Sequence, residues 1–185
     1  MRKLIFALNM TLDGCCDHTK LSADDEMFEY YAQLTRAVDL LVYGRKTYEL
    51  MVPFWPEVAK NHSGQTEAMN DFARAFDSKN IIVFSKALDT VEGNKTRIVR
   101  TDLQEEILKL KQEQGKDMLT GGVSLPSQLI ELGLVDECRF VVQPMIVGEG
   151  KRLLEDISLP EKLNLELVDS KVFNSGFVAL RYLKQ

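Results

Sequence analysis

Three short segments are rich in glycine, hydroxyl or basic residues, and together they suit a phosphate-bearing ligand. They are Gly44-Arg45-Lys46-Thr47, Ser85-Lys86 and Gly121-Gly122-Val123-Ser124. Glycine allows a close backbone approach, basic side chains pair with phosphate oxygens, and N–H groups at a helix start point at an anion. A glycine after a strand is commonly only a turn residue, so no segment is decisive alone. Together they suit a dinucleotide.

Each segment follows a stretch that predicts a β-strand. The stretches are residues 40–43, 81–84 and 117–120, and the second reads as a strand buried on both faces. In an open α/β sheet, ligands bind beyond the carboxyl ends of the strands. We therefore expect the three segments to lie along one edge of a sheet.

A carboxylate follows the first predicted strand, which covers residues 3–10. Asp13 can accept hydrogen bonds from a ligand or relay a proton. Asn9 and Thr11 should lie on the same edge as Asp13, because side chains alternate along a strand. The alternative is a turn in which Asp13 bonds its own backbone before Gly14.

An aromatic group follows the first glycine segment. Tyr48, Phe54 and Trp55 occur in a stretch that Pro53 and Pro56 make irregular, so we expect a loop. Their rings could form a stacking wall for a flat heterocycle or pack in the core under the loop. The residues themselves leave both interpretations open.

Composition limits the class of protein. The 185 residues are 45% hydrophobic and 28% charged, which predicts one globular domain over residues 1–185. The net charge of −5 makes nucleic acids and anionic membranes poor partners. The apolar stretch 4–8 is too short to cross a bilayer.

The cysteine usage favours a reducing compartment. Cys15, Cys16 and Cys138 cannot all pair, so we expect a cytoplasmic protein without a disulfide framework. Cys15, Cys16 and His18 lack the usual spacing of zinc ligands. We therefore expect no metal site.

The remaining pattern fixes the expected fold class. Asp24 or Asp25 and Asp102 should cap helices, while apolar residues recur at helical spacing over 69–76 and 125–132. Residues 174–176 read as a hairpin turn between two alternating strands. The sequence therefore predicts an α/β fold of three layers, with a mostly parallel mixed sheet and a C-terminal antiparallel hairpin.

These motifs occur in an order that resembles the dihydrofolate reductase-like superfamily. The chain is most similar to the RibD C-terminal reductase domain family, which is linked to riboflavin biosynthesis. The matching segments are residues 9–14, 44–49, 83–86, 121–122, 133–137 and 144–150. They run from the first strand almost to the end of the chain.

The resemblance implies an NADPH-dependent reductase that passes hydride to a small heterocycle, of pteridine or riboflavin-precursor type, and that forms a homodimer. Residues 44–47 and 85–86 would then hold the adenosine phosphates. Residues 121–124 would hold the pyrophosphate, with the bond between the two glycines a candidate cis peptide. Asp13 would be catalytic, and Asn9, Tyr48 and Trp55 would face the substrate.

Departures from the resembled families leave a second function open. Thr120 stands where riboflavin-pathway reductases usually carry an acidic residue, and no clear acid replaces it. The zinc deaminase signature is also absent, which excludes the bifunctional pathway enzyme. Dihydrofolate reductases place a carboxylate near Asp24 and Asp25, but helix capping is the interpretation we prefer for both. The alternative function is a nucleotide-binding or sensor protein that keeps the NADPH site without efficient catalysis.

Overall fold

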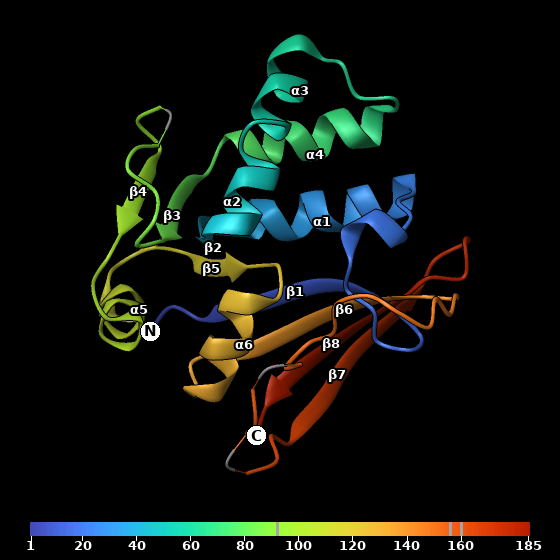
Figure 1. Cartoon of the computed structure of the whole chain (residues 1–185). Helices are drawn as coiled ribbons and strands as arrows, with labels where there is room; N and C mark the ends of the chain where they lie inside the picture. Colours follow the sequence, from blue (N-terminus) through green and yellow to red (C-terminus); the bar gives the residue numbers. More distant parts are fainter. Residues whose placement is uncertain (92, 156, 160) are drawn as a thin grey trace. The chain divides into compact units, whose positions relative to one another are not determined.

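The structure is a computed structural model that describes residues 1–91, 93–155, 157–159 and 161–185 (Figure 1). The strands are β1 (Leu4–Thr11), β2 (Val38–Gly44), β3 (Asn80–Phe84), β4 (Thr96–Val99), β5 (Asp117–Thr120), β6 (Glu137–Gln143), β7 (Leu165–Val172) and β8 (Val178–Lys184). The helices are α1 (Asp25–Ala37), α2 (Arg45–Met51), α3 (Trp55–Asn61), α4 (Glu67–Asp77), α5 (Leu103–Gln112) and α6 (Ser124–Glu131), with a short 3-10 turn η1 (His18–Lys20).

The described strands form one eight-stranded sheet in the order β4-β3-β2-β5-β1-β6-β8-β7. Strand β1 runs parallel to β6, and β3 runs parallel to both β2 and β4. Strand β8 is antiparallel to β6 and β7, and Gly176 in the turn before β8 has φ +84°. The predicted α/β class, with a mostly parallel mixed sheet and a C-terminal hairpin, is confirmed.

Backbone contacts divide the chain into two compact units. The first unit comprises Met1–Arg2 and Ala23–Leu119, and the second comprises Lys3–Ser22 and Thr120–Gln185. A single domain over the whole chain stays a prediction.

Strand β3 is the centre of the first unit's sheet. It pairs with β2 on one side and β4 on the other, and Ile81, Ile82 and Val83 are at most 5% exposed. The prediction of a strand buried on both faces is therefore correct. Strand β4 was not predicted, because it is only four residues long and mixes polar with apolar side chains.

Aromatic packing joins the helices of the first unit. Trp55 lies 4.7 Å from Phe72 and 5.9 Å from Phe28, measured between ring centroids, so that α3, α4 and α1 lie together (Figure 1). The expected loop around residues 53–56 is in part wrong, because α3 begins at Trp55. Pro56 is compatible with that helix because it occupies the first turn, where its missing N–H removes no helical bond.

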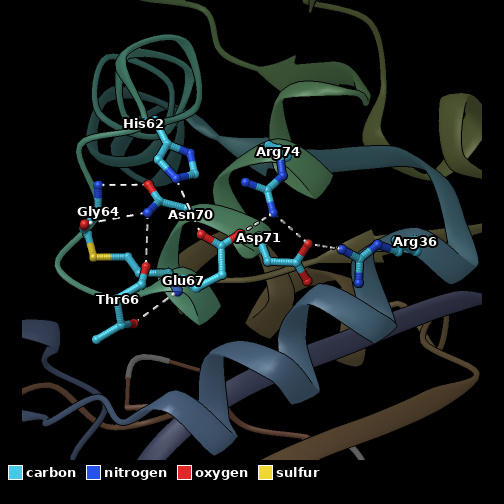
Figure 2. A network of polar contacts seen from close by, with 9 residues as sticks. Arg36, His62, Gly64, Thr66, Glu67, Asn70, Asp71 and Arg74 are labelled. Carbon is cyan, nitrogen blue, oxygen red and sulfur yellow. Dashed lines mark hydrogen bonds and ion pairs between the residues drawn. The ribbon is translucent and has the colours of Figure 1, made fainter.

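A polar network fixes the connection between α3 and α4 (Figure 2). The buried Asn70 accepts from Gly64 N at 2.8 Å and donates to Thr66 O at 3.1 Å. Thr66 caps α4 by accepting from Met69 N at 3.2 Å. A Cβ on Gly64 would lie 2.8 Å from Asn70 Oδ1, so the turn needs glycine.

The same network ties α4 to α1 through charged groups (Figure 2). Asp71 accepts from Arg36 on α1 and from Arg74 one turn later on α4. Arg74 also donates to Glu67 at 2.7 Å. These ion pairs are at least partly exposed, so we expect each to contribute less than about 1 kcal/mol to stability.

The second unit is organised by β1 and β6. Phe6 on β1 packs edge-on against Phe140 on β6, with ring centroids 5.6 Å apart. Asp136, just before β6, accepts from Leu4 N at 2.7 Å through Oδ2. Both contacts join residues more than 130 positions apart and hold the two strands in one register.

A buried carboxylate links β6 to β8. Glu137 is 2% exposed, accepts from Arg139 Nε at 2.6 Å, and accepts from Arg181 Nε and Nη2 at 3.0 Å. Burial alone would raise the pKa of Glu137, but the hydrogen bonds from the two guanidinium groups outweigh burial and lower it. The carboxylate therefore stays ionised and offsets part of the positive charge of two arginines that pair directly across the strands.

We predict that Asn70→Ala lowers the free energy of unfolding by about 1–3 kcal/mol, because it removes the side-chain hydrogen bonds to Gly64 N and Thr66 O in the partly buried α3–α4 turn. Urea unfolding followed by circular dichroism measures this loss. Asn61→Ala is the matched control, since Asn61 is exposed and bonds only to Glu57 among the contacts described. An Asn70→Ala variant as stable as the control would show that the network contributes nothing.

Candidate functional site

In the first unit, two of the predicted phosphate segments lie at neighbouring strand ends. Gly44 at the end of β2 pairs with Phe84 at the end of β3, so Arg45 and Ser85 leave the sheet side by side. Lys86 follows Ser85 and is exposed. The structure therefore brings the segments 44–47 and 85–86 together, as the strand pattern predicted.

One side chain in each of these two segments already has a local partner. Arg45 pairs with Glu49 at 3.1 Å, one turn along α2, and both are nearly half exposed. Ser85 Oγ accepts from Ala87 N at 3.1 Å and from Leu88 N at 3.0 Å, which closes the turn after β3. An exposed pair such as Arg45–Glu49 contributes little to stability, so Arg45 can exchange its partner for a phosphate.

In the second unit, the segment 121–124 joins β5 to α6. Gly122 has φ +84°, a conformation that favours glycine. No described peptide bond is cis, so the candidate cis peptide between Gly121 and Gly122 is trans. Val123 occupies the N-cap position of α6 but makes no capping hydrogen bond with its side chain, and the first turn of α6 contains no acid. The backbone N–H groups that start α6 therefore have neither a side-chain cap nor a neighbouring acid within the helix.

Thr120, the last residue of β5, is fully buried, and its Oγ1 has no hydrogen-bond partner in the described structure. A buried hydroxyl without a partner costs free energy. This residue immediately precedes Gly121, so the strand end that leads into the predicted phosphate loop carries an unsatisfied polar atom.

Asp13 is the hub of contacts between two loops, residues 11–20 and 145–154, which we call the paired loops. Its carboxylate accepts from Gly148 N at 2.9 Å, from Val147 N at 3.4 Å and from the Thr11 hydroxyl. Arg152 Nη2 lies 3.5 Å from Oδ2. The side chain therefore reaches the second of the paired loops instead of serving only the turn at Gly14.

These contacts determine the charge of Asp13. The Thr11 hydroxyl is the largest influence and the Gly148 N–H the next, and together they lower the pKa of Asp13 to about 2. The carboxylate is ionised at neutral pH. It is therefore suited to accept hydrogen bonds or to orient a ligand, and poorly suited to donate a proton.

Backbone contacts reinforce the pairing of the loops. Leu12 N donates to Met145 O at 3.0 Å, and Cys16 N donates to Lys151 O at 2.7 Å. Gly150 has φ +105°, and a Cβ there would lie 2.6 Å from Cys15 Sγ. Only glycine allows the second loop to pass this close to the first.

The predicted substrate residues have different environments. Asn9 is half-buried near the end of β1, and Tyr48 is 7% exposed on α2. Trp55 is half-buried and packs against Phe54 at 4.9 Å as well as against Phe72. The core-packing interpretation of Trp55 therefore accounts for its contacts, and its contact with a substrate stays a prediction.

Three polar residues were missed or only partly interpreted in the sequence. Lys151 donates from Nζ to Ser124 Oγ at 3.0 Å, and Arg152 contacts Asp13. Their adjacency to the Gly148-Glu149-Gly150 turn was the available signal. Asp24 caps α1 as predicted, with Oδ1 accepting from Met27 N at 2.7 Å, but its buried Oδ2 has no partner in the described structure.

The cysteines are buried free thiols, and burial raises the pKa of Cys16 and of Cys138 to about 11. Among the described residues, no group of three or more His, Cys, Asp or Glu side chains is placed to hold a metal ion. No helix in the described ranges is both long and apolar enough to cross a membrane.

Comparison with known proteins identifies the family. A model of the RibD C-terminal domain matches residues 2–179. The chain belongs to the RibD C-terminal domain family. It is also 33% identical to a Bacillus subtilis (strain 168) protein, "Uncharacterized protein YyaP", over 98% of this chain and 94% of that protein.

Two solved structures share the fold of this RibD C-terminal domain protein. RibD of Acinetobacter baumannii has a TM-score of 0.70 and 15% identity, and the match covers 100% of this chain but 58% of RibD. A dihydrofolate reductase of Enterococcus faecalis, complexed with NADP(H), has a TM-score of 0.62 and 16% identity, with 99% and 96% coverage. The predicted likeness to both reductase folds is therefore confirmed.

We predict that the Gly148 amide reports an unusually acidic Asp13. Because the pKa of Asp13 is lowered from 3.8 to about 2, its contribution to the loop pairing is complete above pH 4 and is lost only as the pH falls toward 2. In a ¹H–¹⁵N NMR titration, the Gly148 amide shift should stay flat from pH 6 to about pH 3. Asp13→Asn should remove any later change, whereas a midpoint near pH 4 in the wild type would contradict the assignment.

Proposed function

We propose that the protein is an NADPH-dependent reductase that acts on a small heterocyclic substrate, of pteridine or riboflavin-precursor type. One observation carries the proposal. Gly122 at positive φ leads into the uncapped start of α6, where the ammonium of Lys151 lies beside Ser124. A cation beside the positive end of a helix is unfavourable unless an anion neutralises the cation and the helix end together. This arrangement therefore fits a cofactor phosphate.

The residues fit the two phosphate groups of NADPH in different ways. Arg45, Lys46 and Lys86 would pair with the 2′-phosphate of the adenosine, with the hydroxyls of Thr47 and Ser85 as hydrogen-bond partners. Residues Gly121, Gly122, Val123 and Ser124 would hold the diphosphate through backbone N–H groups. When bound, NADPH supplies the hydride, and the protein supplies binding and orientation.

Asp13 would act on the substrate side as an ionised acceptor. Its low pKa supports orientation of a substrate N–H or O–H group over donation of a proton. Asn9, Tyr48 and Trp55 would complete the substrate contacts. Because the Asp13 carboxylate also holds the paired loops, its catalytic contribution would come through position and charge together.

The second candidate function is a nucleotide-binding or sensor protein without efficient catalysis. The buried Thr120, which replaces the usual acid, and the ionised state of Asp13 favour it, because neither residue supplies a proton at neutral pH. Turnover of NADPH with a panel of pteridine and pyrimidine substrates separates the two functions. Binding without oxidation of the cofactor on any of them would support the sensor.

We also propose a homodimer formed through one face of β6, β8 and β7. Strand pairing places a set of apolar side chains on this face, which we call the hairpin face: Phe140, Val142, Leu167, Val172, Val178, Leu180 and Tyr182. All seven are half-buried or exposed, and Val172 is 71% exposed. A contiguous apolar patch of this kind is typical of a protein interface.

The unpaired cysteines continue to favour a cytoplasmic location.

The cofactor prediction is that NADPH binds ten- to a hundredfold more tightly than NADH, because each charge-assisted phosphate contact contributes about 1.5–3 kcal/mol. Fluorescence titration of both cofactors measures the ratio. Lys86→Gln should reduce it, whereas Lys60→Gln on α3, which pairs only with Glu57 among the contacts described, should not. Equal affinities for the two cofactors would contradict the 2′-phosphate assignment.

The dimer prediction is that light scattering after gel filtration gives twice the chain mass of 21.0 kDa. Leu180→Lys on the hairpin face should produce monomers, because a charge would be buried in the interface. Leu108→Lys on α5, where Leu108 is 42% exposed, is the matched control. A monomeric wild type would refute the proposed interface.

A further inference from the structure

Lys151 contacts two parts of the second unit, the first of the paired loops and the start of α6. Its carbonyl accepts from Cys16 N at 2.7 Å, in the first of the paired loops. Its ammonium donates to Ser124 Oγ at 3.0 Å, at the first residue of α6. One residue therefore joins the loop that carries Asp13 to the start of the helix that follows Gly122.

The position of the ammonium is electrostatically unusual. The N-terminus of a helix carries a partial positive charge, and α6 has no acid in its first turn and no side-chain cap. A cationic side chain such as lysine is poorly suited to this position in the absence of an anion. Its placement there is explained if a phosphate oxygen completes the arrangement.

The segment that carries Lys151 is held on both sides. Arg152 contacts Asp13, and Leu154 N donates to Ser127 Oγ at 3.3 Å, one turn into α6. Lys151 is half-buried, so its stem is restricted as well. Less conformational entropy is therefore lost when its ammonium takes a phosphate oxygen.

We propose that Lys151 is a further cofactor-binding residue, which neutralises the diphosphate at the start of α6 and links its occupation to the loop that carries Asp13. The inference rests on the proposed NADPH site and adds a residue that the strand-end pattern did not include. On binding, the ammonium exchanges Ser124 Oγ for a phosphate oxygen or bridges both. Because the carbonyl of Lys151 holds Cys16, fixing this residue also restricts residues 11–16.

The test separates the charge of Lys151 from its structural bond. Lys151→Gln keeps a donor for Ser124 Oγ but removes the charge, and Lys151→Arg keeps the charge. Lys162→Gln, at an exposed lysine of the same unit, is the control. NADPH affinity is measured for each variant by fluorescence titration at low and high salt, with thermal unfolding as the check on folding.

We expect Lys151→Gln to weaken NADPH binding about tenfold or more at low salt, with a shallower salt dependence than the wild type because one ionic contact is missing. Lys151→Arg should retain most of the affinity, and Lys162→Gln all of it. Hydrogen exchange of residues 11–16 should slow when NADPH binds to the wild type, and less so in Lys151→Gln.

Three results would overturn different statements. If the wild type binds NADPH and Lys151→Gln binds it equally well, the role of Lys151 is wrong while the cofactor site stands. If the wild type does not bind NADPH, the proposed function fails, and the role of Lys151 fails with it. If Lys151→Gln weakens binding but leaves the slowing of hydrogen exchange unchanged, the link to the loop is wrong.

Discussion

The register of β1 against β6 determines which residues of the two loops can meet. Ile5 pairs with Glu137 at one end of the ladder, and Thr11 pairs with Gln143 at the other. A shift by one residue would turn every side chain of β1 to the opposite face of the sheet. The chain prevents this with side-chain bonds at both ends.

These end contacts are partly buried and join specific atoms. Asp136 accepts from Leu4 N at 2.7 Å beside the first pairs. At the other end, the fully buried Gln143 accepts from Ser22 N at 3.0 Å and donates to Ser22 O at 2.7 Å. The loops that follow Thr11 and Gln143 therefore start side by side. The Asp13 carboxylate can then take the N–H groups of residues 147 and 148, and Lys151 can reach Cys16.

Local rules predicted the parts of the fold that depend on short-range physics. Asp24 and Asp102 cap their helices because a carboxylate two or three residues before a free N–H is sufficient, and the apolar stretch 81–84 is a buried strand. Strand β4 and helix α3 were not predicted, because β4 depends on its pairing with β3 and α3 depends on the aromatic packing of Trp55. The strand-end segments 44–47 and 85–86 were brought together by parallel pairing, which strand periodicity anticipates. The contacts of Asp13 with residues more than 130 positions away depend on register, which no local pattern contains.

Because the thiols are buried, the rate at which a reagent labels them reports how often the surrounding structure opens. Cys15 is fully buried where Gly150 passes over it, and Cys138 is 2% exposed on β6 in the sheet of the same unit. A thiol reagent can attack Cys15 when the paired loops separate, whereas Cys138 requires the sheet itself to open. The difference between their labelling rates would therefore measure local opening against global unfolding in the unmodified protein.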